Sequence, residues 1–587
     1  MLKSKHRWSL VCLLGLFAAA GAWGCQSKGS PVAAKTPTRA PDAAQANVAS
    51  PPNAPQNSKN GASAPAASPK AAPGGNKAPA ATQKPAQNNA AAPIKANAKP
   101  VAEPGCAPWP GRKVEPRVPS DDLLPNGIAS GGLRATSAKL WARTKEPAKV
   151  KFLYSAGPDC PVQSTGEVST TASDDFTAHF PLTGLRPGTL YRYQAQVGAA
   201  KPSSPGWFVT APAADGPDVP VKLAFSADVS GFADQLENIK ILAKEGADFY
   251  ISMGDWPYAD LHEKPKHPNQ FRRYYFQSRA GHNMEAMMRM VPVHPVWDDH
   301  EVINDWDGRQ EKWNPKAVIS GKKVWHEWWP IADAPKGEIY RKHRWGPGLE
   351  IFYLDTRSHR VSNNAPADGK TMLGLEQRRW LLESLSASTA PFKLVVTSVP
   401  LKFAITFKDS WMGFKQEQDI ILGHIAKERI SGVVFLAGDQ HFYASHQYTE
   451  GMRQWQAGPL AFRTFSPLQR PPDEVIKQGE GRNYGVIKYT PGSPAKLTLE
   501  VHLERKGVVY TETLQAGVGQ LDVQPPGAQW GWRIEGAHRF VGKGPRSIPI
   551  APVGQYTISW VAPDGQISAD AQTATLAADQ TVVLRVK

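Results

Sequence analysis

Ile-Ser-Met-Gly-Asp-Trp-Pro-Tyr (residues 251–258) is the segment from which we predict both the architecture and the chemistry of this chain. A short apolar run ends here in Gly-Asp, which is typical of a buried parallel strand that carries a carboxylate to the C-terminal edge of a sheet. One carboxylate can bridge two cations, and the phenol of Tyr258 is near enough along the chain to reach one of them. A Gly-Asp after a strand is more often an ordinary turn, so the interpretation depends on other strand ends.

Three further strand ends carry acidic or imidazole side chains. Asp228 follows the apolar residues 223–225, Asp-Asp-His-Glu (298–301) follows residues 293–297, and Gly-Asp-Gln-His (438–441) follows residues 433–436. Because the carboxyl ends of parallel strands meet at one edge of an α/β sheet, these side chains are expected to converge. Their number favours one shared site over several independent turns.

The chain is predicted to contain several units, because 587 residues are too many for one domain. Strand and helix patterns alternate over residues 221–515, which predicts an α/β catalytic domain. Residues 106–215 combine short alternating strands with turn residues and predict an all-β sandwich of fibronectin or immunoglobulin type, with a packing or spacer role. Residues 525–587 begin with Pro-Pro-Gly and predict a small C-terminal β module. This module is expected either to be a packing appendage or to contact cell-wall glycans.

Residues 1–25 are similar to a bacterial lipoprotein signal peptide. Three basic residues precede an apolar run over residues 10–20 that is too short to span a membrane. Ala-Trp-Gly-Cys (22–25) resembles a lipobox, in which Cys25 would carry the lipid anchor; ordinary signal cleavage near this point is the alternative. Gln26, in place of Asp, suggests the outer membrane by resemblance to bacterial sorting rules. We therefore expect a protein of the bacterial cell envelope, in the periplasm or at the outer membrane.

Residues 26–105 are rich in Ala, Pro, Asn, Lys and Gln and predict a disordered tether. Residues 1–105 hold twelve Lys and Arg against two acids, so they account for +10 of the net charge of +16 and leave +6 for the rest. Overall charge is therefore no argument for nucleic-acid binding, and we expect none. The tether either contacts anionic envelope polymers or serves solubility alone.

The cysteines fit an exported protein. Cys12 belongs to the signal and Cys25 to the expected anchor, which leaves Cys106 and Cys160 as an even pair. A disulfide between them is the default outside the cytoplasm.

The acidic and imidazole residues match the needs of a phosphoesterase with two metal ions. Phosphate esters resist nucleophiles because of their negative charge, and two neighbouring cations neutralise that charge and acidify a bridging water. We predict that Asp255 bridges both ions, that His300 is the general acid, and that the remaining ligands are Asp228, Tyr258 and His441 for one metal and Asp299 and Asp439 for the other.

Each assignment has a structural alternative. Asp228 could cap the helix that follows, Tyr258 and His300 could be structural, and Asp298 is expected to support ligands rather than to bind metal. Arg357 could bind phosphate oxygens in a bidentate manner or form a structural ion pair with an Asp.

Two further clusters are open to two interpretations each. Four tryptophans could wall a substrate pocket, although such clusters more often belong to the core; they are Trp325, Trp328, Trp329 and Trp345. Residues 262–290 carry several arginines and aromatic residues and predict a helical cap near the site, with a solvated helix face as the alternative.

Five motifs occur in an order that resembles one known family. They are Gly-Asp-x-x-Tyr (254–258), Trp-Asp-Asp-His-Glu-Val (297–302), Leu-Asp-Thr-Arg-Ser (354–358), Leu-Gly-Leu-Glu-Gln (373–377) and Gly-Asp-Gln-His (438–441). This order is similar to that of the alkaline phosphatase D family of calcineurin-like metallophosphoesterases, over residues 120–515. The resemblance implies a four-layer α/β/β/α catalytic domain behind a fibronectin-like domain, an iron and calcium pair, and hydrolysis of phosphate mono- or diesters outside the cytoplasm.

The chain departs from the family pattern at two places. Many members have Ser-Cys at the end of the first strand, where this chain has Ala227-Asp228, so Zn, Mn or Mg are alternatives to Fe and Ca. No residue matches the middle His ligand of the wider superfamily; Asn304 is a candidate replacement, although Asn-Asp at this point also fits an ordinary turn.

The predicted reaction is attack of a metal-activated water on the phosphorus atom, with His300 helping the leaving group. No covalent phosphoenzyme is expected, because no Ser, Thr or Cys stands in a recognisable nucleophile motif. The rival hypothesis is a catalytically inactive, envelope-binding lipoprotein built on the same fold. The expected partners are a phosphate-ester substrate and, through Cys25, a membrane.

Overall fold

Two large sheets form the centre of the structure, a computed structural model. It describes residues 106–585 except 232, 332–337, 403, 449–450, 473 and 569–570, and all of them belong to the unit Ala90–Lys587. The predicted signal peptide, the lipobox cysteine and the tether lie outside the described residues. Among the helices described, none has the length and apolar character needed to cross a membrane.

The first sheet has nine strands, and its three central strands run parallel and side by side. The central strand is buried at all five positions, as its unbroken apolar run predicts. In spatial order the strands are β21 (Gly507–Gln515), β20 (Lys496–Leu503), β19 (Asn483–Thr490), β9 (Val221–Ser226), β10 (Phe249–Met253), β11 (Val293–Val296), β1 (Ile128–Gly131), β2 (Ser137–Arg143) and β6 (Thr177–Thr183).

The second sheet has seven strands, four of which are parallel neighbours. Its order is β12 (Arg341–Trp345), β13 (Leu349–Tyr353), β14 (Phe392–Val396), β15 (Val433–Ala437), β17 (Arg453–Gln456), β16 (Tyr443–Gln447) and β18 (Val475–Gly479). The strands predicted from the apolar runs at 223–225, 293–297 and 433–436 are present as β9, β11 and β15, with ends that differ by at most two residues.

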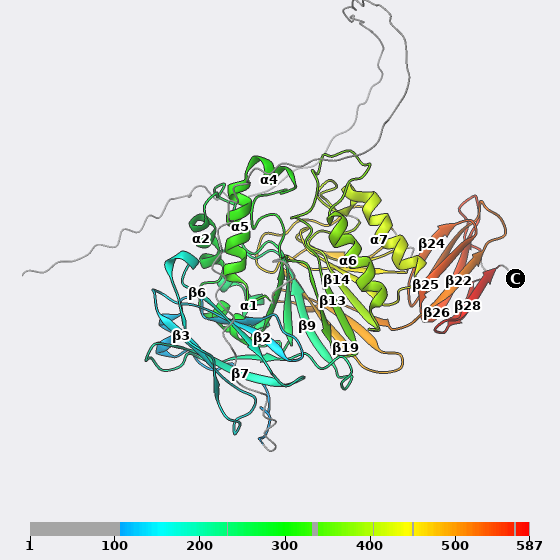
Figure 1. The fold of residues 1–587 in the computed structure, drawn as a ribbon. Coiled ribbons are helices and arrows are strands. Elements are labelled where there is room, and N and C mark those ends of the chain that lie inside the picture. Colours follow the sequence, from blue (N-terminus) through cyan, green and yellow to red (C-terminus); the bar gives the residue numbers. More distant parts are fainter. Residues whose placement is uncertain are drawn as a thin grey trace, which may run out of the picture. The chain divides into compact units, whose positions relative to one another are not determined.

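The two sheets pack face to face, and helices cover their outer faces (Figure 1). Side chains alternate between the two faces of each strand: Leu223 and Ile251 lie in the core between the sheets, whereas Ala224 and Tyr250 pack against helices. Helices on the first sheet are α1 (Glu237–Leu242), α2 (Pro268–Ser278), α3 (His282–Met290) and α5 (Pro315–Trp328), with α4 (Arg309–Trp313) against α5; those on the second are α6 (Gly374–Ala387) and α7 (Lys415–Lys427).

Residues 106–215 differ from a self-contained sandwich. One sheet of this region is separate and contains β3 (Lys149–Ser155), β4 (Gln163–Ser164), β5 (Val168–Ser169), β7 (Leu190–Val197) and β8 (Gly206–Val209). The facing strands β1, β2 and β6 continue the first sheet, because β1 pairs in parallel with β11 at Gly131 and Val293. A Cβ atom at Gly131 would lie 2.5 Å from the carbonyl oxygen of Val293, so only glycine permits this approach.

The predicted disulfide between Cys106 and Cys160 is present. It joins the start of the described chain to the loop that follows β3. A disulfide is typical of proteins in oxidising compartments.

The C-terminal β module begins before the predicted boundary at residue 525. Strand β22 (Val518–Gln524) already pairs with β25 (Arg546–Pro552) and β28 (Thr581–Arg585). A second sheet packs on these strands through a separate apolar core; it contains β23 (Gly531–Gly536), β24 (Phe540–Lys543), β26 (Gly554–Val561) and β27 (Gln572–Leu576). The module also contacts the catalytic region, since the backbone N–H of Arg539 donates to Gln447.

The segment of residues 262–290 forms helices, as predicted, but α2 and α3 pack against the first sheet and are neither a cap over the site nor a fully solvated face. Three of its arginines are buried in structural contacts: Arg272 pairs with Glu327, Arg289 donates to backbone carbonyls, and Arg279 lies among Trp141, Trp328 and Trp329. The predicted tryptophan cluster is therefore core, with Trp345 in the separate core between the sheets.

Candidate metal centre

The predicted site residues follow the carboxyl ends of four strands in the two sheets. Asp228 follows β9, Asp255 follows β10, Asp299 and His300 follow β11, and Asp439 and His441 follow β15. At four of these positions the backbone is left-handed, with φ of 66° at Asp228, 55° at Asp255, 66° at Asp439 and 58° at His441. Residues other than glycine rarely adopt this conformation, and it concentrates at functional sites.

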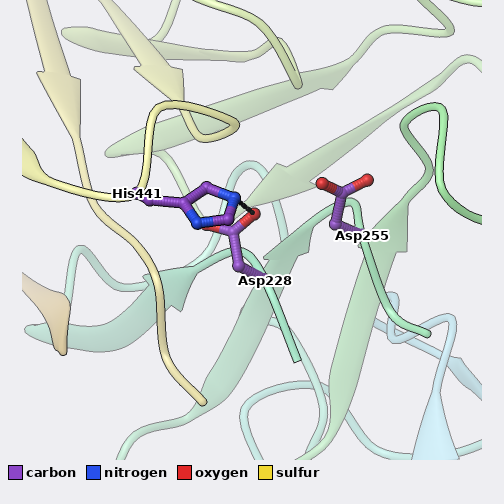
Figure 2. Close-up of side chains that lie close together, drawn as sticks. All are labelled: Asp228, Asp255 and His441. Atoms are coloured by element: carbon purple, nitrogen blue, oxygen red, sulfur yellow. Dashed lines mark ion pairs between the residues drawn. The ribbon is translucent and has the colours of Figure 1, made fainter. Parts of the chain in front are cut away.

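Asp228, Asp255 and His441 form the first group of possible metal ligands. One ligand atom from each lies within 4.8 Å of the others, and all three side chains are buried. Figure 2 shows them approaching from separate parts of the chain, with the His441 ring beside the Asp228 carboxylate. The Nε2 of His441 lies 3.5 Å from Oδ1 of Asp228. Helix α1 begins after Leu236, so the alternative role of Asp228 as its cap is wrong.

Tyr258 completes this group. Its hydroxyl donates to Oδ1 of Asp228 at 3.0 Å and lies 2.9 Å from Nε2 of His441. The other ring nitrogen of His441, Nδ1, lies 2.8 Å from the carbonyl oxygen of Arg463 and therefore carries its proton there. The lone pair of Nε2 therefore points to the other possible ligands and could bind a metal ion, which is the arrangement that metal-binding histidines use.

Asp255, Asp299 and His300 form a second group, again with ligand atoms within 4.8 Å of one another. Asp255 thus belongs to both groups. The Nδ1 of His300 lies 2.6 Å from Oδ1 of Asp260. Burial lowers the pKa of His300, but the charges of Asp299 and Asp260 outweigh burial and raise it to about 9.

The buried negative charge of the two groups fits cations. Burial and then the neighbouring carboxylates, Asp299 first, raise the pKa of Asp255 well above its usual range. Within the part of the chain that the structure describes, Oδ2 of Asp228 and Oδ1 of Asp299 are buried without a hydrogen-bond partner. Uncompensated carboxylates are unfavourable in a buried site unless they meet cations or protons, so the residues present fit a metal centre.

Asp439 lies near these groups but belongs to neither. Its Oδ2 accepts hydrogen bonds from Gln440 and, at 3.4 Å, from the hydroxyl of Thr406. Burial, and then the charges of Asp298, Asp409 and Asp299, raise the pKa of Asp439 well above its usual range. The side chain of Asn304 is exposed, and its backbone N–H donates to Asp260.

Arg357 forms the structural ion pair that the sequence left as one of two possibilities. It is fully buried, its Nε donates to Asp298 at 2.5 Å, and its two terminal nitrogens donate to Asp409 at 2.8 and 2.7 Å. A fourth bond goes to the carbonyl oxygen of Trp306. With its donors engaged in this way, the guanidinium supports the loop of Asp298 and Asp299, and the catalytic assignment of Arg357 is corrected.

Sequence reasoning gave no role to two carboxylates that shape the site. Glu301 accepts hydrogen bonds from the backbone N–H groups of Asp255, Trp256 and Asp298 and so fixes the loops after β10 and β11 together. Burial raises the pKa of Glu301 to about 8. Asp260 orients His300; its position two residues after Tyr258 was the available signal.

Comparison with known proteins agrees with this geometry. A family model described as PhoD-like phosphatase matches residues 235–475, and one described as PhoD-like phosphatase, N-terminal domain, matches residues 111–212. Together they match more than half of the chain. The chain belongs to the PhoD-like phosphatase family. Asp228 lies between the two matched ranges of this PhoD-like chain.

The relatives of this PhoD-like chain are distant in sequence. Alkaline phosphatase D of Bacillus subtilis (strain 168) is 25% identical over 373 residues. The matched region covers 54% of this chain and 64% of that protein, which is less than two thirds of its length. A solved structure of PhoD superposes with a TM-score of 0.58 at 18% identity, over 80% of this chain and 95% of that one. Purple acid phosphatase PPD1 from yellow lupin superposes with a TM-score of 0.50 at 13% identity, over 67% and 75%. At such identities the two structures support the metallophosphoesterase-like fold alone.

Proposed function

We propose that this PhoD-like protein is a metal-dependent phosphatase that hydrolyses phosphate esters. The observation that carries the proposal is that Asp255 belongs to two groups of neighbouring side chains. In one it lies with Asp228 and His441; in the other it lies with Asp299 and with His300, which we assign to proton transfer and not to metal binding. A carboxylate with two oxygens between two such groups can hold two cations at once. Two cations, when bound, neutralise phosphate charge and lower the pKa of water.

In this proposal the chain positions the cations through side chains that are already held in place. Glu301 fixes the backbone of Asp255, and the carbonyl of Arg463 fixes the ring of His441. Tyr258 is held by stacking on Phe462 at 3.9 Å between ring centroids. Rings and carboxylates that are fixed before binding lose little conformational freedom when they become ligands. This increases the affinity for the metal and holds the ligand atoms in the geometry that it needs.

His300 is proposed as the group that protonates the leaving oxygen. Asp260 engages Nδ1, so Nε2 is the ring nitrogen that can transfer a proton to substrate. A hydrogen-bonded carboxylate that orients an imidazole is the arrangement used by many general acids and bases. Arg357 is engaged with Asp298 and Asp409, so His300 is the side chain left to meet the phosphate charge, and bound cations would supply the rest.

The metals and the ester class are finer parts of the proposal. A phenol, an imidazole and a carboxylate around one position favour iron, and the more carboxylate-rich position suits calcium, with Zn, Mn and Mg as the alternatives. Both phosphomonoesters and phosphodiesters are proposed substrates. The four-layer α/β/β/α arrangement of the wider superfamily, with an N-terminal β domain, is proposed as the scaffold of this activity.

We also propose that the protein acts outside the cytoplasm as a lipoprotein anchored through Cys25. The Cys106–Cys160 disulfide supports export. Contact of residues 26–105 with envelope polymers is part of the same proposal. Labelling cells with a fatty-acid probe tests the anchor: a Cys25→Ala variant is expected to lose the label and leave the membrane fraction.

The activity is tested with purified protein that is first stripped of metal and then reconstituted with Fe and Ca, Zn, Mn or Mg. Turnover of p-nitrophenyl phosphate and bis-p-nitrophenyl phosphate is measured together with bound metal. Metal-dependent turnover is expected. Absence of both stoichiometric metal and turnover in every reconstitution would overturn the proposal and favour the inactive envelope-binding alternative.

A further inference from the structure

We propose that Glu338, Asp355 and His359 form a separate binding site for one divalent transition cation. One ligand atom from each of these side chains lies within 4.8 Å of the other two. None of the three residues belongs to the groups around Asp255. Protein ligands lie about 2.0–2.2 Å from a bound zinc ion, so a cation could contact all three after small side-chain movements.

The sheet topology brings these residues together. Strands β12 and β13 are antiparallel neighbours, with Arg341 opposite Tyr353. Glu338 precedes β12 and Asp355 follows β13, so both lie at the same end of this strand pair. His359 follows a few residues later, and its Nε2 lies 3.1 Å from Oε2 of Glu338.

Asp355 distinguishes the group from an ordinary surface ion pair. Its side chain is 1% exposed, and Oδ1 accepts three N–H groups, from the indole of Trp297 and the backbone of Arg357 and Ser358. Its Oδ2 is buried and has no hydrogen-bond partner among the described residues. A buried carboxylate oxygen without a partner is unfavourable, and a cation beside Glu338 and His359 would supply that partner.

A cavity of about 360 Å³ opens beside the group and is lined by Glu338 and His359. Two more acids, Glu311 and Glu376, line it as well. Its arginine, Arg360, is fully buried and donates to Asp409 and to the carbonyl oxygen of Thr356. An acidic cavity of this kind favours a hydrated cation over a phosphate group.

The ligand set indicates the class of cation. Two carboxylates and one imidazole suit divalent transition metals such as zinc. Glu338 is 29% exposed and His359 33% exposed, so the site is reached from solvent, and water from the cavity would fill the remaining coordination positions.

Zinc binding to the full-length protein tests the site without use of turnover. In a background that carries Asp255→Asn and His441→Ala, to weaken the main centre, isothermal titration with Zn²⁺ is expected to give one site per chain. Adding Glu338→Gln and His359→Gln is expected to abolish that site. The matched control is Glu500→Gln with His502→Gln. This change removes a Glu–His pair with a similar separation of 3.3 Å, which belongs neither to this group nor to the groups around Asp255. The control protein is expected to keep the zinc site.

A second measurement uses the wild-type protein, in case the background variants do not fold. At free Zn²⁺ of about ten times its dissociation constant, modification of His359 by diethylpyrocarbonate is expected to slow by about tenfold, because only the metal-free ring reacts. Peptide mass spectrometry reads this, and His502 is expected not to show the same effect. Equal modification of His359 with and without Zn²⁺ would overturn the proposal. So would equal zinc stoichiometry with and without Glu338 and His359, or no bound zinc in the folded background protein.

Discussion

The hydroxyl oxygen of Tyr258 lies 2.9 Å from Nε2 of His441, although 183 residues separate them in the chain. Tyr258 follows a strand of the first sheet and His441 a strand of the second, so this contact joins the two sheets at their carboxyl ends. The same hydroxyl donates to Asp228. One phenol therefore connects two of the proposed ligands, and its removal is informative.

Replacing Tyr258 with Phe is expected to weaken metal binding and to lower kcat/KM by about 10- to 100-fold, the range found when groups that contact metal ligands are removed. The phenyl ring keeps its stacking on Phe462, so the fold is expected to remain intact. Metal content and kinetics of the purified variant provide the measurement. Unchanged metal content and turnover would exclude Tyr258 from the centre.

Arg357→Met is expected to lower the free energy of unfolding by about 3–5 kcal/mol, because it leaves the buried carboxylates of Asp298 and Asp409 without their partner. Urea unfolding provides the measurement. The control is Arg273→Met, which removes an exposed arginine paired with Glu263 and is expected to change stability by less than about 1 kcal/mol. A phosphate-binding role for Arg357 predicts the opposite outcome, a raised KM at unchanged stability.

The difference between the predicted and observed roles of Arg357 shows what the sequence can and cannot reveal. The apolar runs before Asp228, Asp255 and Asp439 predicted buried strands with acids at one edge, because strand burial and strand direction follow from local pattern. The partner of a guanidinium depends on distant parts of the chain. Asp409 lies 52 residues after Arg357 in a loop without a recognisable motif, so the ion pair could not be predicted.

His300→Asn is expected to reduce kcat about 10²- to 10⁴-fold for an alkyl phosphate, whose leaving group needs a proton. The reduction is expected to be much smaller for p-nitrophenyl phosphate, whose leaving group departs without one. Asp260→Asn is expected to show the same pattern more weakly, since Asp260 acts by orienting the ring. Equal losses on both substrates, together with loss of metal, would show that His300 is a ligand and not the acid.

His343→Phe is expected to make the protein more resistant to acid. Burial, and then the neighbouring His294, Arg341 and Arg134, lower the pKa of His343 well below its usual value near 6.5. Below pH 6.5 the unfolded chain therefore takes up a proton that the folded one does not, and stability falls as pH falls, by up to about 1.4 kcal/mol per pH unit.

The substitution itself is mild, because neither ring nitrogen of His343 has a hydrogen-bond partner among the described residues, and Phe has a similar shape. Thermal unfolding of the variant and the wild type between pH 4 and 8 checks the prediction. An identical decline of stability for both proteins below pH 6.5 would contradict it.

Domain boundaries were the least predictable part of the fold. Pro525-Pro526-Gly527 suggested the start of the C-terminal module, but β22 precedes it and pairs with β28, nearly sixty residues later. Likewise, nothing local in the Ile-Ala-Ser-Gly strand at 128–131 shows that it will pair with β11 of the catalytic region. Both pairings are long-range, and local patterns carry no information about which edges meet.

The most direct test of the central claim is the metal content and turnover of Asp255→Asn, measured on the reconstituted protein beside the wild type. Because Asp255 belongs to both groups, we predict two bound ions at the main centre of the wild type and loss of at least one of them in the variant. Phosphate-ester turnover of the variant is expected to fall by at least about 10³-fold. Its circular dichroism spectrum is expected to be unchanged. A variant that keeps both ions and the turnover of the wild type would contradict the account.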